Sequence, residues 1–364
     1  MIKKVIISGG GTGGHIYPAI AIANALKAID PTIQILFVGA LGKMEMEKVP
    51  KAGYEIIGLP IAGIKRELSV DNLSFPLKLT RSLLKARSII KSFKPDVAIG
   101  VGGFASGPLL MVASLLGIPT LIQEQNSYAG ITNKLLAKRA KAICVAYPNM
   151  DSFFPKNKLK MTGNPVRSDI LDVTHKRTQA YAHFGLQPNH KTLLVIGGSL
   201  GAKTINESIE AGLKLLINSG YQVLWQTGKP YAEKAANAIN SLKTPYAKSF
   251  DFIYEMDLAY ALADVVVSRA GALSVSELCL VAKPAILVPF PYASEDHQTK
   301  NAMSLVEQNA ALLIKDKDAP EELVQTALRL LQDTEKQQTL SQNIKKLGKP
   351  NAAKEIAETV LGLI

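Results

Sequence analysis

KKVIISGGGTGGHIYPAIAIANALKAI, at residues 3–29, decides the fold of this chain. Its β-branched run at residues 5–7 predicts a buried parallel strand, and the apolar spacing after the glycines predicts a helix at about 17–28. A second stretch, TLLVIGGSLGAKTINESIEAGLKLLIN at residues 192–218, repeats the strand, the glycine turn and the helix. One copy in each half of the chain predicts two α/β domains of similar design.

The glycine turns also predict what these domains bind. Glycine has no Cβ, so such a turn can adopt positive φ and aim free N–H groups at an anion. The helix that follows adds partial positive charge at the same point. A third turn of this kind, GVGGFASGP at residues 100–108, again follows a predicted strand. We therefore expect a ligand that carries phosphate groups.

Length and composition limit the architectures that this chain can adopt. The chain has 364 residues, 47% hydrophobic and 20% charged, which suits two ordinary globular domains. Its two cysteines, Cys144 and Cys279, lie in apolar stretches and predict core positions rather than a bridge or a metal site. No signal peptide is predicted, and the longest apolar stretch, at residues 108–122, is too short and interrupted to span a membrane.

The charge is concentrated in one half of the chain. Residues 1–164 contain 21 Lys and Arg against 9 Asp and Glu, whereas residues 165–364 contain 21 of each. A basic half predicts an anionic partner, such as nucleic acid, anionic lipid or a polyphosphate. Nucleic acid is disfavoured, because no recognisable reading motif is present.

Alternating strand and helix patterns predict a doubly wound parallel sheet in each half. We expect an N-terminal domain at residues 1–164 and a C-terminal domain at 165–349, which face each other across a cleft. The segment at residues 163–167 is the predicted hinge. The expected strands lie at residues 4–8, 33–38, 96–101, 120–123 and 142–145 in the first half, and at 192–196, 222–226, 249–252, 265–268 and 285–288 in the second.

A basic amphipathic helix is predicted at residues 71–94. One interpretation is a surface helix whose apolar stripe packs on its own sheet. The other is a membrane-surface element, with Phe75 and Leu79 near its start as lipid contacts. The two interpretations can hold for different faces of the helix.

Two nucleotide-binding alternatives fit poorly. Gly9, Gly11 and Gly14 satisfy the GxGxxG pattern of dehydrogenases, but the second strand ends in Gly39 and Ala40, not in the acidic residue that holds a ribose. In the second turn, Ala202 separates the glycine from the lysine and breaks the loop pattern of phosphate-binding NTPases. Neither a dehydrogenase nor an NTPase is expected.

Two residues are candidate general bases. His15 lies at the opening of the first helix, where an imidazole could take a proton from a substrate hydroxyl or merely cap the helix. Glu124 follows a strand end and could act as the base or hold the neighbouring loops through backbone N–H groups. The sequence favours His15 and leaves Glu124 as the alternative.

The stretch SRAGALSVSE at residues 268–277 opens a helix whose N-terminus again favours an anion. Glu277 lies about two turns into this helix, where its carboxylate could accept two hydrogen bonds from a ribose diol or could simply be solvated. The histidines form no metal-ligand pattern, and the DKD stretch at residues 316–318 is expected to be solvated charge. No metal and no cofactor are expected.

Together these motifs resemble the MurG family of bacterial N-acetylglucosaminyltransferases, two-domain glycosyltransferases of the GT-B architecture. They follow the family's order between residues 8 and 302: GGGTGGHIYPAIAIA, GVGGFASGP, QEQN, GNPVR, GGSLGA, SRAGALSVSE and DHQTKNA. The resemblance implies inverting transfer of GlcNAc from UDP-GlcNAc to the 4-hydroxyl of MurNAc on undecaprenyl-diphosphate-MurNAc-pentapeptide, which converts lipid I to lipid II in peptidoglycan synthesis. A UDP-GlcNAc 2-epimerase and another GT-B glycolipid glycosyltransferase remain alternatives.

The resemblance also implies roles for individual residues. Thr12, Gly13 and Gly14 would lie near the donor diphosphate and the acceptor, Asn126 would contact the sugar, and Arg167 and Ser199 would contact the diphosphate. Ile253 would meet uracil through its backbone, Glu277 would hold the ribose, and Gln298 would hold the GlcNAc hydroxyls. The residues expected to line the nucleotide and diphosphate are Ala272, Leu273, Ser274, Val275 and Ser276.

The basic N-terminal domain would accordingly take the lipid-linked acceptor. The implied location is the cytoplasmic face of the bacterial inner membrane, with peripheral attachment to its anionic leaflet. The family folds its last helix, here at about residues 350–364, back onto the N-terminal domain.

Overall fold

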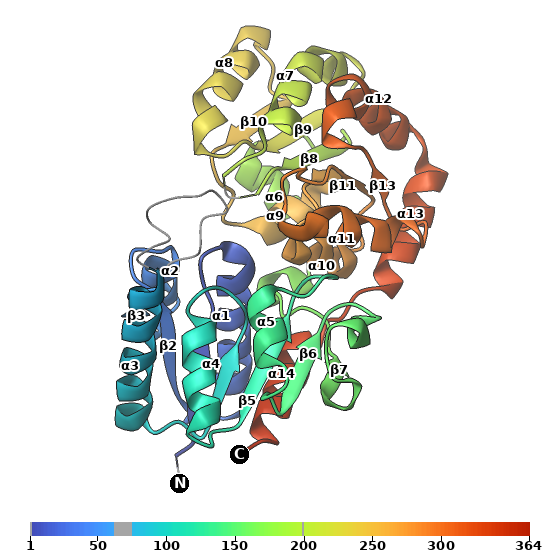
Figure 1. The fold of residues 1–364 in the computed structure, drawn as a ribbon. Coiled ribbons are helices and arrows are strands. Elements are labelled where there is room, and N and C mark those ends of the chain that lie inside the picture. The colour runs from blue at the N-terminus through green and yellow to red at the C-terminus, as the bar shows by residue number, and fades with distance from the viewer. Residues whose placement is uncertain (1, 62–74, 199) are drawn as a thin grey trace. The chain divides into compact units, whose positions relative to one another are not determined.

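The computed structural model describes residues 2–61, 75–198 and 200–364. The chain divides into two compact units (Figure 1). Unit 1 comprises Met1–Arg167 and Pro350–Ile364, and unit 2 comprises Ser168–Lys349. The division falls slightly after the predicted boundary at residue 164, so that Arg167 belongs to unit 1.

Unit 1 contains a parallel sheet of seven strands in the order β3-β2-β1-β4-β5-β6-β7. Its strands are β1 (Lys4–Ser8), β2 (Gln34–Ala40), β3 (Glu55–Leu59), β4 (Val97–Gly100), β5 (Thr120–Glu124), β6 (Ala142–Val145) and β7 (Leu159–Met161). Its α-helices are α1 (Gly13–Ile29), α2 (Glu45–Lys51), α3 (Phe75–Phe93), α4 (Ser106–Leu115), α5 (Ile131–Leu136) and α14 (Ala352–Leu361).

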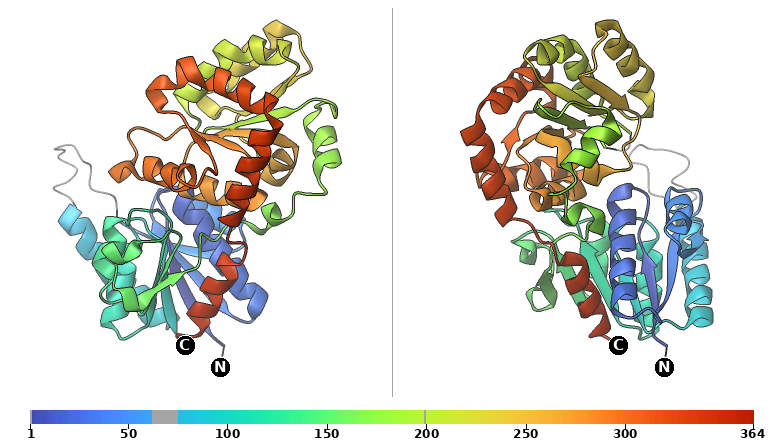
Figure 2. Two further views of the ribbon diagram at one scale, coloured as in Figure 1. Left: turned by 90° about the vertical axis from the view of Figure 1, so that its right-hand side faces the viewer. Right: turned by 180° about the vertical axis from the view of Figure 1, so that it is seen from behind.

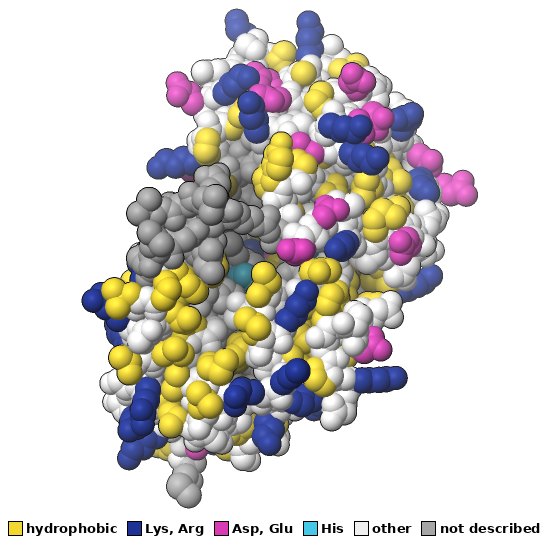
Figure 3. All heavy atoms as spheres, viewed as in Figure 1, with side chains coloured by type: hydrophobic (Ala, Val, Ile, Leu, Met, Phe, Trp, Pro, Cys, Tyr) yellow, Lys and Arg dark blue, Asp and Glu magenta, His cyan; other side chains and the backbone are white. Residues whose placement is uncertain are grey.

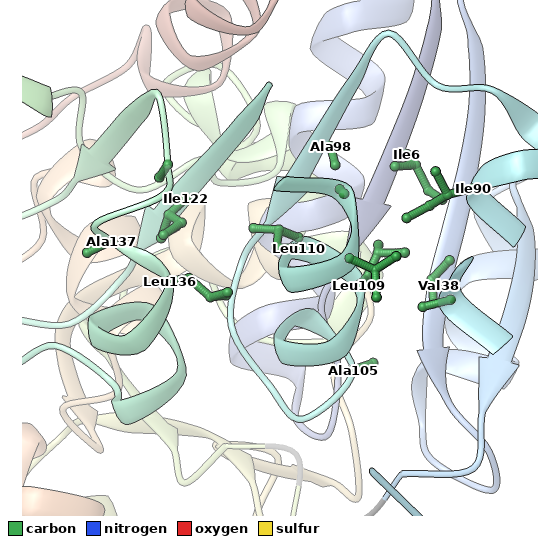
Figure 4. Packing of buried hydrophobic residues seen from close by; sticks show 14 of the residues in the cluster. Ile6, Val38, Ile90, Ala98, Ala105, Leu109, Leu110, Ile122, Leu136 and Ala137 are labelled. Carbon is green, nitrogen blue, oxygen red and sulfur yellow. The ribbon is translucent and has the colours of Figure 1, made fainter. Parts of the chain in front are cut away.

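Helices cover both faces of this sheet, which explains its almost continuous apolar strands. Val5 and Ile7 of β1 pack in a cluster with α1 and α14. Ile6 faces the opposite side, where Ile90 of α3 and Leu109 of α4 complete a second cluster (Figure 4). The C-terminal helix α14 therefore contributes directly to the core of unit 1.

Unit 2 contains a parallel sheet of six strands in the order β10-β9-β8-β11-β12-β13. Its strands are β8 (Thr192–Ile196), β9 (Gln222–Gln226), β10 (Ala247–Phe250), β11 (Ala263–Ser268), β12 (Ala285–Leu287) and β13 (Leu312–Leu313). Its α-helices are α6 (Arg177–Phe184), α7 (Lys203–Asn218), α8 (Ala232–Leu242), α9 (Met256–Leu262), α10 (Ala272–Val281), α11 (His297–Val306), α12 (Ala319–Gln332) and α13 (Thr334–Lys346). Figure 2 shows the two units from two further sides.

In both sheets the first strand in sequence lies beside the fourth. Strand order reverses at that point, between β1 and β4 in unit 1 and between β8 and β11 in unit 2. In unit 1 the helices after these strands, α1 and α4, belong to core clusters on opposite faces of the sheet, and in such folds ligands bind at the carboxyl edge where the strand order reverses. The α/β, doubly wound fold predicted for each half is confirmed.

The sequence did not predict β3, β7 and β13. These strands are short or partly exposed, so they lack the continuous apolar run that marks the central strands. The strand expected at residues 249–252 lies two residues earlier, as β10. The predicted helix at residues 71–94 is observed as α3 from Phe75, and residues 71–74 lie outside the described part of the chain.

Both cysteines are buried in the cores, as predicted. Burial raises the pKa of the Cys144 and Cys279 thiols to about 12, because a thiolate would lose its hydration there. Among the described helices, none is both long and apolar enough to cross a bilayer.

Candidate functional site

The glycine loops of unit 1 meet at the point where its strand order reverses. A Cβ on Gly103, in the loop after β4, would lie 2.4 Å from the carbonyl oxygen of Gly10, in the loop after β1. Gly103 has φ +87° and Gly11 has the same value, a conformation that glycine adopts without strain. The hydroxyl of Ser106 joins the loops further, because its single proton lies between the Ser8 and Gly102 carbonyls, whose oxygens are 2.9 and 2.7 Å from Oγ.

His15 lies in the first turn of α1, half-buried, with its ring against Gly102. A Cβ on Gly102 would lie only 2.8 Å from Nε2 of the ring. His15 Nδ1 lies 3.1 Å from the Gly10 carbonyl oxygen. A carbonyl can only accept, so Nδ1 carries the proton and a neutral ring has its lone pair on Nε2. This is the tautomer that a base acting through Nε2 requires.

Glu45, which the sequence analysis did not single out, lies beneath the first glycine loop. Its side chain is fully buried, and its two carboxylate oxygens accept from Gly11 N–H and Ala40 N–H, each at 2.9 Å. Gly10 and Gly39 leave space for it, because a Cβ on either would collide with the Glu45 side chain. The carboxylate therefore ties the loop after β1 to the end of β2.

Glu124, the alternative base, is almost completely buried at the end of β5. Its Oε2 accepts from Gly130 N–H at 2.9 Å and from the Asn133 amide at 2.8 Å, while Oε1 accepts from Asn126 N–H at 3.1 Å. These donors come from the loop after β5 and the start of α5. The geometry thus favours the second role considered for this residue, which is to hold the loops.

The remaining candidates of unit 1 lie at the start of α1 and in the segments after β5 and β7. Thr12 is the N-cap of α1, and Gly13 and Gly14 form its first turn. The Asn126 backbone is fixed by Glu124. The Arg167 guanidinium lies over the Tyr17 ring of α1, 5.7 Å from its centroid.

The segment that carries Arg167 is anchored by buried amides. Gln123 donates to the side-chain oxygen of Asn164 at 3.0 Å, and Asn164 donates to the Gln125 carbonyl at 2.9 Å. Gln125 in turn donates to the Val101 carbonyl at 2.8 Å. This chain of hydrogen bonds joins residues 163–167 to the ends of β4 and β5.

In unit 2, the glycine loop after β8 is joined to the segment after β10. The amide of Gln226, at the end of β9, donates to the Gly198 carbonyl at 3.1 Å and accepts from Ile253 N–H at 2.9 Å. Because this bond uses the Ile253 N–H, any base contact through its backbone would use the carbonyl. Ser199 lies outside the described residues.

Helix α10 begins at the carboxyl end of β11, with Gly271 as its N-cap. Its first turn contains no acidic side chain, so the N-terminal N–H groups and the helix dipole favour an anion there. Along α10, Ala272 and Val275 are buried, and Leu273, Ser274 and Ser276 are half-buried.

Glu277 is the sixth residue of α10, and only 9% of it is exposed. Its Oε2 accepts a hydrogen bond from the hydroxyl of Tyr260, on α9, at 3.0 Å. The interpretation of Glu277 as a solvated helix charge is therefore wrong, because the carboxylate is largely enclosed and held by a second helix.

Asp316, in the DKD stretch, forms an ion pair with Arg269. Asp316 was expected to be solvated, but it accepts from Arg269 Nη1 at 2.5 Å and from the Thr204 hydroxyl at 2.9 Å. Arg269, 8% exposed, also donates to the Val288 and Pro289 carbonyls at 3.1 Å. The pair connects the loop after β11, the end of β12 and the start of α7.

Gln298 lies at the start of α11, beside the loop that follows β12. Its Oε1 accepts from Phe290 N–H at 2.9 Å. That bond fixes the orientation of the amide, whose NH₂ group can donate to a hydroxyl of a ligand. Among the described residues, no three His, Cys, Asp or Glu side chains are placed to hold a metal ion.

Unit 1 also has an apolar and basic surface, which we call the α3–α5 face. Phe75 and Leu79, predicted as membrane contacts, are half-buried and pack against the core. The exposed apolar side chains of this face are instead Leu77 (56%), Leu84 (63%), Ile131 (69%) and Leu135 (70%). Figure 3 shows apolar side chains interspersed with Lys and Arg on this side of unit 1. Lys78, Arg81 and Lys85 lie on α3, and Lys138 follows α5.

Two domain descriptions of one enzyme family match the chain. The glycosyltransferase family 28 N-terminal domain matches residues 5–145, and the family 28 C-terminal domain matches residues 192–356. Curated relatives from Cytophaga hutchinsonii and Bacteroides fragilis are 58% and 55% identical, over 99% of this chain and 97% and 95% of theirs. Both are named UDP-N-acetylglucosamine--N-acetylmuramyl-(pentapeptide) pyrophosphoryl-undecaprenol N-acetylglucosamine transferase.

Solved structures agree with this relationship. MurG of Acinetobacter baumannii is 29% identical over 99% of both chains, with a TM-score of 0.79. A UDP-GlcNAc 2-epimerase from Neisseria meningitidis has a TM-score of 0.68 at 16% identity over the whole of both chains, which shows a shared GT-B fold alone. The chain therefore belongs to glycosyltransferase family 28 and, within it, to the MurG family.

Proposed function

We propose that this protein is the inverting transferase that moves GlcNAc from UDP-GlcNAc to the MurNAc 4-hydroxyl of undecaprenyl-diphosphate-MurNAc-pentapeptide. The observation that carries this proposal is identity of up to 58% over 99% of the chain to relatives whose names specify this donor and this acceptor. The α10 N-terminus and the enclosed Glu277 carboxylate support a nucleotide-sugar site in unit 2.

The donor belongs to unit 2. The Ile253 backbone meets uracil, Glu277 accepts from the ribose, and Gln298 donates to the GlcNAc hydroxyls. The diphosphate lies at the N-terminus of α10, along Ala272 to Ser276. The diphosphate contacts expected from Ser199 and Arg167 stay predictions. Because the diphosphate gains charge as the sugar departs, N–H groups already aimed at it stabilise the transition state.

The acceptor belongs to unit 1. Nε2 of His15 takes the proton of the MurNAc 4-hydroxyl while its oxygen attacks C1 of GlcNAc. The bond from C1 to the diphosphate oxygen breaks in the same step, UDP leaves, and the configuration at C1 is inverted. Thr12, Gly13, Gly14 and Asn126 lie near the reacting groups, and Glu124 and Glu45 hold the loops that carry them.

Membrane attachment uses the α3–α5 face, at the anionic inner leaflet on the cytoplasmic side. Its exposed leucines enter the interface, and its Lys and Arg side chains attract anionic headgroups. This arrangement presents unit 1 to an acceptor whose lipid tail remains in the bilayer.

Replacing both Leu77 and Leu84 with serine should weaken sedimentation with anionic liposomes at least about tenfold, because a leucine loses about 1.5–3 kcal/mol when it is not buried. UDP-GlcNAc binding should be unchanged. Leu215→Ser, which alters an exposed leucine of α7 in unit 2, is the matched control. If the double variant binds liposomes as well as wild type, the leucines do not enter the membrane. Binding would then depend on charge attraction to anionic lipid alone, and high salt would abolish it.

The overall reaction is tested by measuring UDP release with and without the lipid-linked acceptor. We expect release only when undecaprenyl-diphosphate-MurNAc-pentapeptide is present, together with transfer of labelled GlcNAc to it. Conversion of UDP-GlcNAc to its 2-epimer without any acceptor would instead identify an epimerase, and transfer only to other glycolipids would change the acceptor.

A further inference from the structure

Tyr260 is a fully buried tyrosine whose hydroxyl meets a carboxylate of the donor site. It lies on α9, and 0% of it is exposed. Its hydroxyl donates to Glu277 Oε2 at 3.0 Å. Glu277 lies on α10, 17 positions after Tyr260. The bond therefore connects two successive helices of unit 2.

The bond restricts what the Glu277 carboxylate can do. A glutamate side chain has three rotatable bonds, and its carboxylate plane is set by whatever donates to it. Glu277 is 9% exposed, so a small part of it remains accessible to a ligand. A carboxylate has about four acceptor positions, of which the Tyr260 bond uses one.

We propose that Tyr260 is a positioning residue that orients Glu277 for the ribose diol and thereby sets the preference for a ribonucleotide over a 2′-deoxyribonucleotide. The inference rests on the proposed function, in which Glu277 accepts from the ribose of UDP-GlcNAc. A carboxylate fixed in one plane meets both hydroxyls of a diol at once. A carboxylate that can rotate meets them one at a time and gains less from the second.

This role predicts that loss of the Tyr260 hydroxyl weakens the discrimination between UDP and 2′-deoxy-UDP. Sites built to bond a substrate hydroxyl discriminate strongly against analogues that lack it, because the site's own polar group is then left unpaired. Wild type should bind UDP at least about tenfold more tightly than 2′-deoxy-UDP. In Tyr260→Phe, the affinity for UDP should fall about three- to tenfold while the affinity for 2′-deoxy-UDP changes little.

The experiment is calorimetric titration of the full chain with UDP and with 2′-deoxy-UDP, which requires no acceptor and no turnover. Tyr181→Phe is the matched control. Tyr181 is also largely buried in unit 2, but its hydroxyl accepts from Arg177 Nε at 3.0 Å, and Arg177 binds Asp264 at the start of β11. The control should keep the wild-type ratio of the two dissociation constants.

Each outcome of the titrations is informative. A smaller ratio in Tyr260→Phe but not in Tyr181→Phe supports the proposal. An unchanged ratio, or a loss of affinity equal for both nucleotides, overturns it, because a merely structural tyrosine would affect both ligands alike. Glu277→Gln tests the ribose contact itself: if this variant also keeps the wild-type ratio of dissociation constants, Glu277 is not the ribose acceptor. Failure of wild type to bind UDP would contradict the proposed function.

Discussion

Replacing His15 with alanine should lower kcat about 10²- to 10⁴-fold, the usual contribution of a general base. The donor affinity should change little, because His15 is not among the proposed donor contacts. The effect is measured as the rate of GlcNAc transfer at saturating donor and acceptor, with calorimetric titration of UDP-GlcNAc as the check on binding.

His15→Asn separates catalysis from capping. An asparagine amide can replace Nδ1–H as the donor to the Gly10 carbonyl, which His15 Nδ1 approaches at 3.1 Å, but it has nothing equivalent to Nε2. If His15 is the base, the asparagine and alanine variants should be comparably slow, and both should lose the rise of kcat with pH that a histidine base produces. Near-normal turnover in His15→Asn would reduce His15 to a capping residue.

The parts of the fold that the sequence predicts well are those that local chemistry determines. The central strands are β-branched runs buried on both faces, and the turns after β1, β4 and β8 need glycine for positive φ or for close approach. Gly103 illustrates this, since its φ is +87° and any Cβ would strike the Gly10 backbone. Such positions leave a clear sequence signal.

The positioning residues leave no such signal. Glu45 accepts from a backbone N–H 34 positions away, and Arg269 pairs with Asp316 47 positions away. In the sequence, each of these residues looks like an ordinary surface charge, because its partner comes close only in the folded domain. The MEMEK stretch around Glu45, two glutamates among polar and apolar neighbours, gives no reason to prefer the buried one over Glu47, which pairs with Lys51 at the surface.

The same limit applies to the membrane contacts expected at two residues of α3, which stay a prediction. Phe75 and Leu79 share the apolar side of an amphipathic helix, and the sequence cannot show which apolar residues the sheet covers. The structure buries them in part and leaves Leu77 and Leu84 exposed. Apolar spacing therefore predicted the helix, while packing decided its outer face.

Glu124→Ala should lower the free energy of unfolding of unit 1 by about 1–3 kcal/mol, since it removes the acceptor of three donors and leaves the buried one, the Asn133 amide, unpaired. The donors are Gly130 N–H, Asn126 N–H and the Asn133 amide. Urea unfolding of the full chain, followed by a probe of unit 1, measures the loss. Glu358→Ala, which removes an exposed partner of Lys354, should change stability by less than about 0.5 kcal/mol.

Glu124→Gln then decides between the two roles of this residue. The glutamine keeps the shape and one accepting oxygen but turns an NH₂ group toward a donor, so a loop-holding carboxylate predicts intermediate stability. Below the unfolding transition, kcat should then fall less than about tenfold, because the proposed base, His15, is intact. If Glu124→Gln were instead as stable as wild type and as slow as His15→Ala, the carboxylate would be the base, and the hydrogen bonds that enclose it would have to open when the acceptor binds.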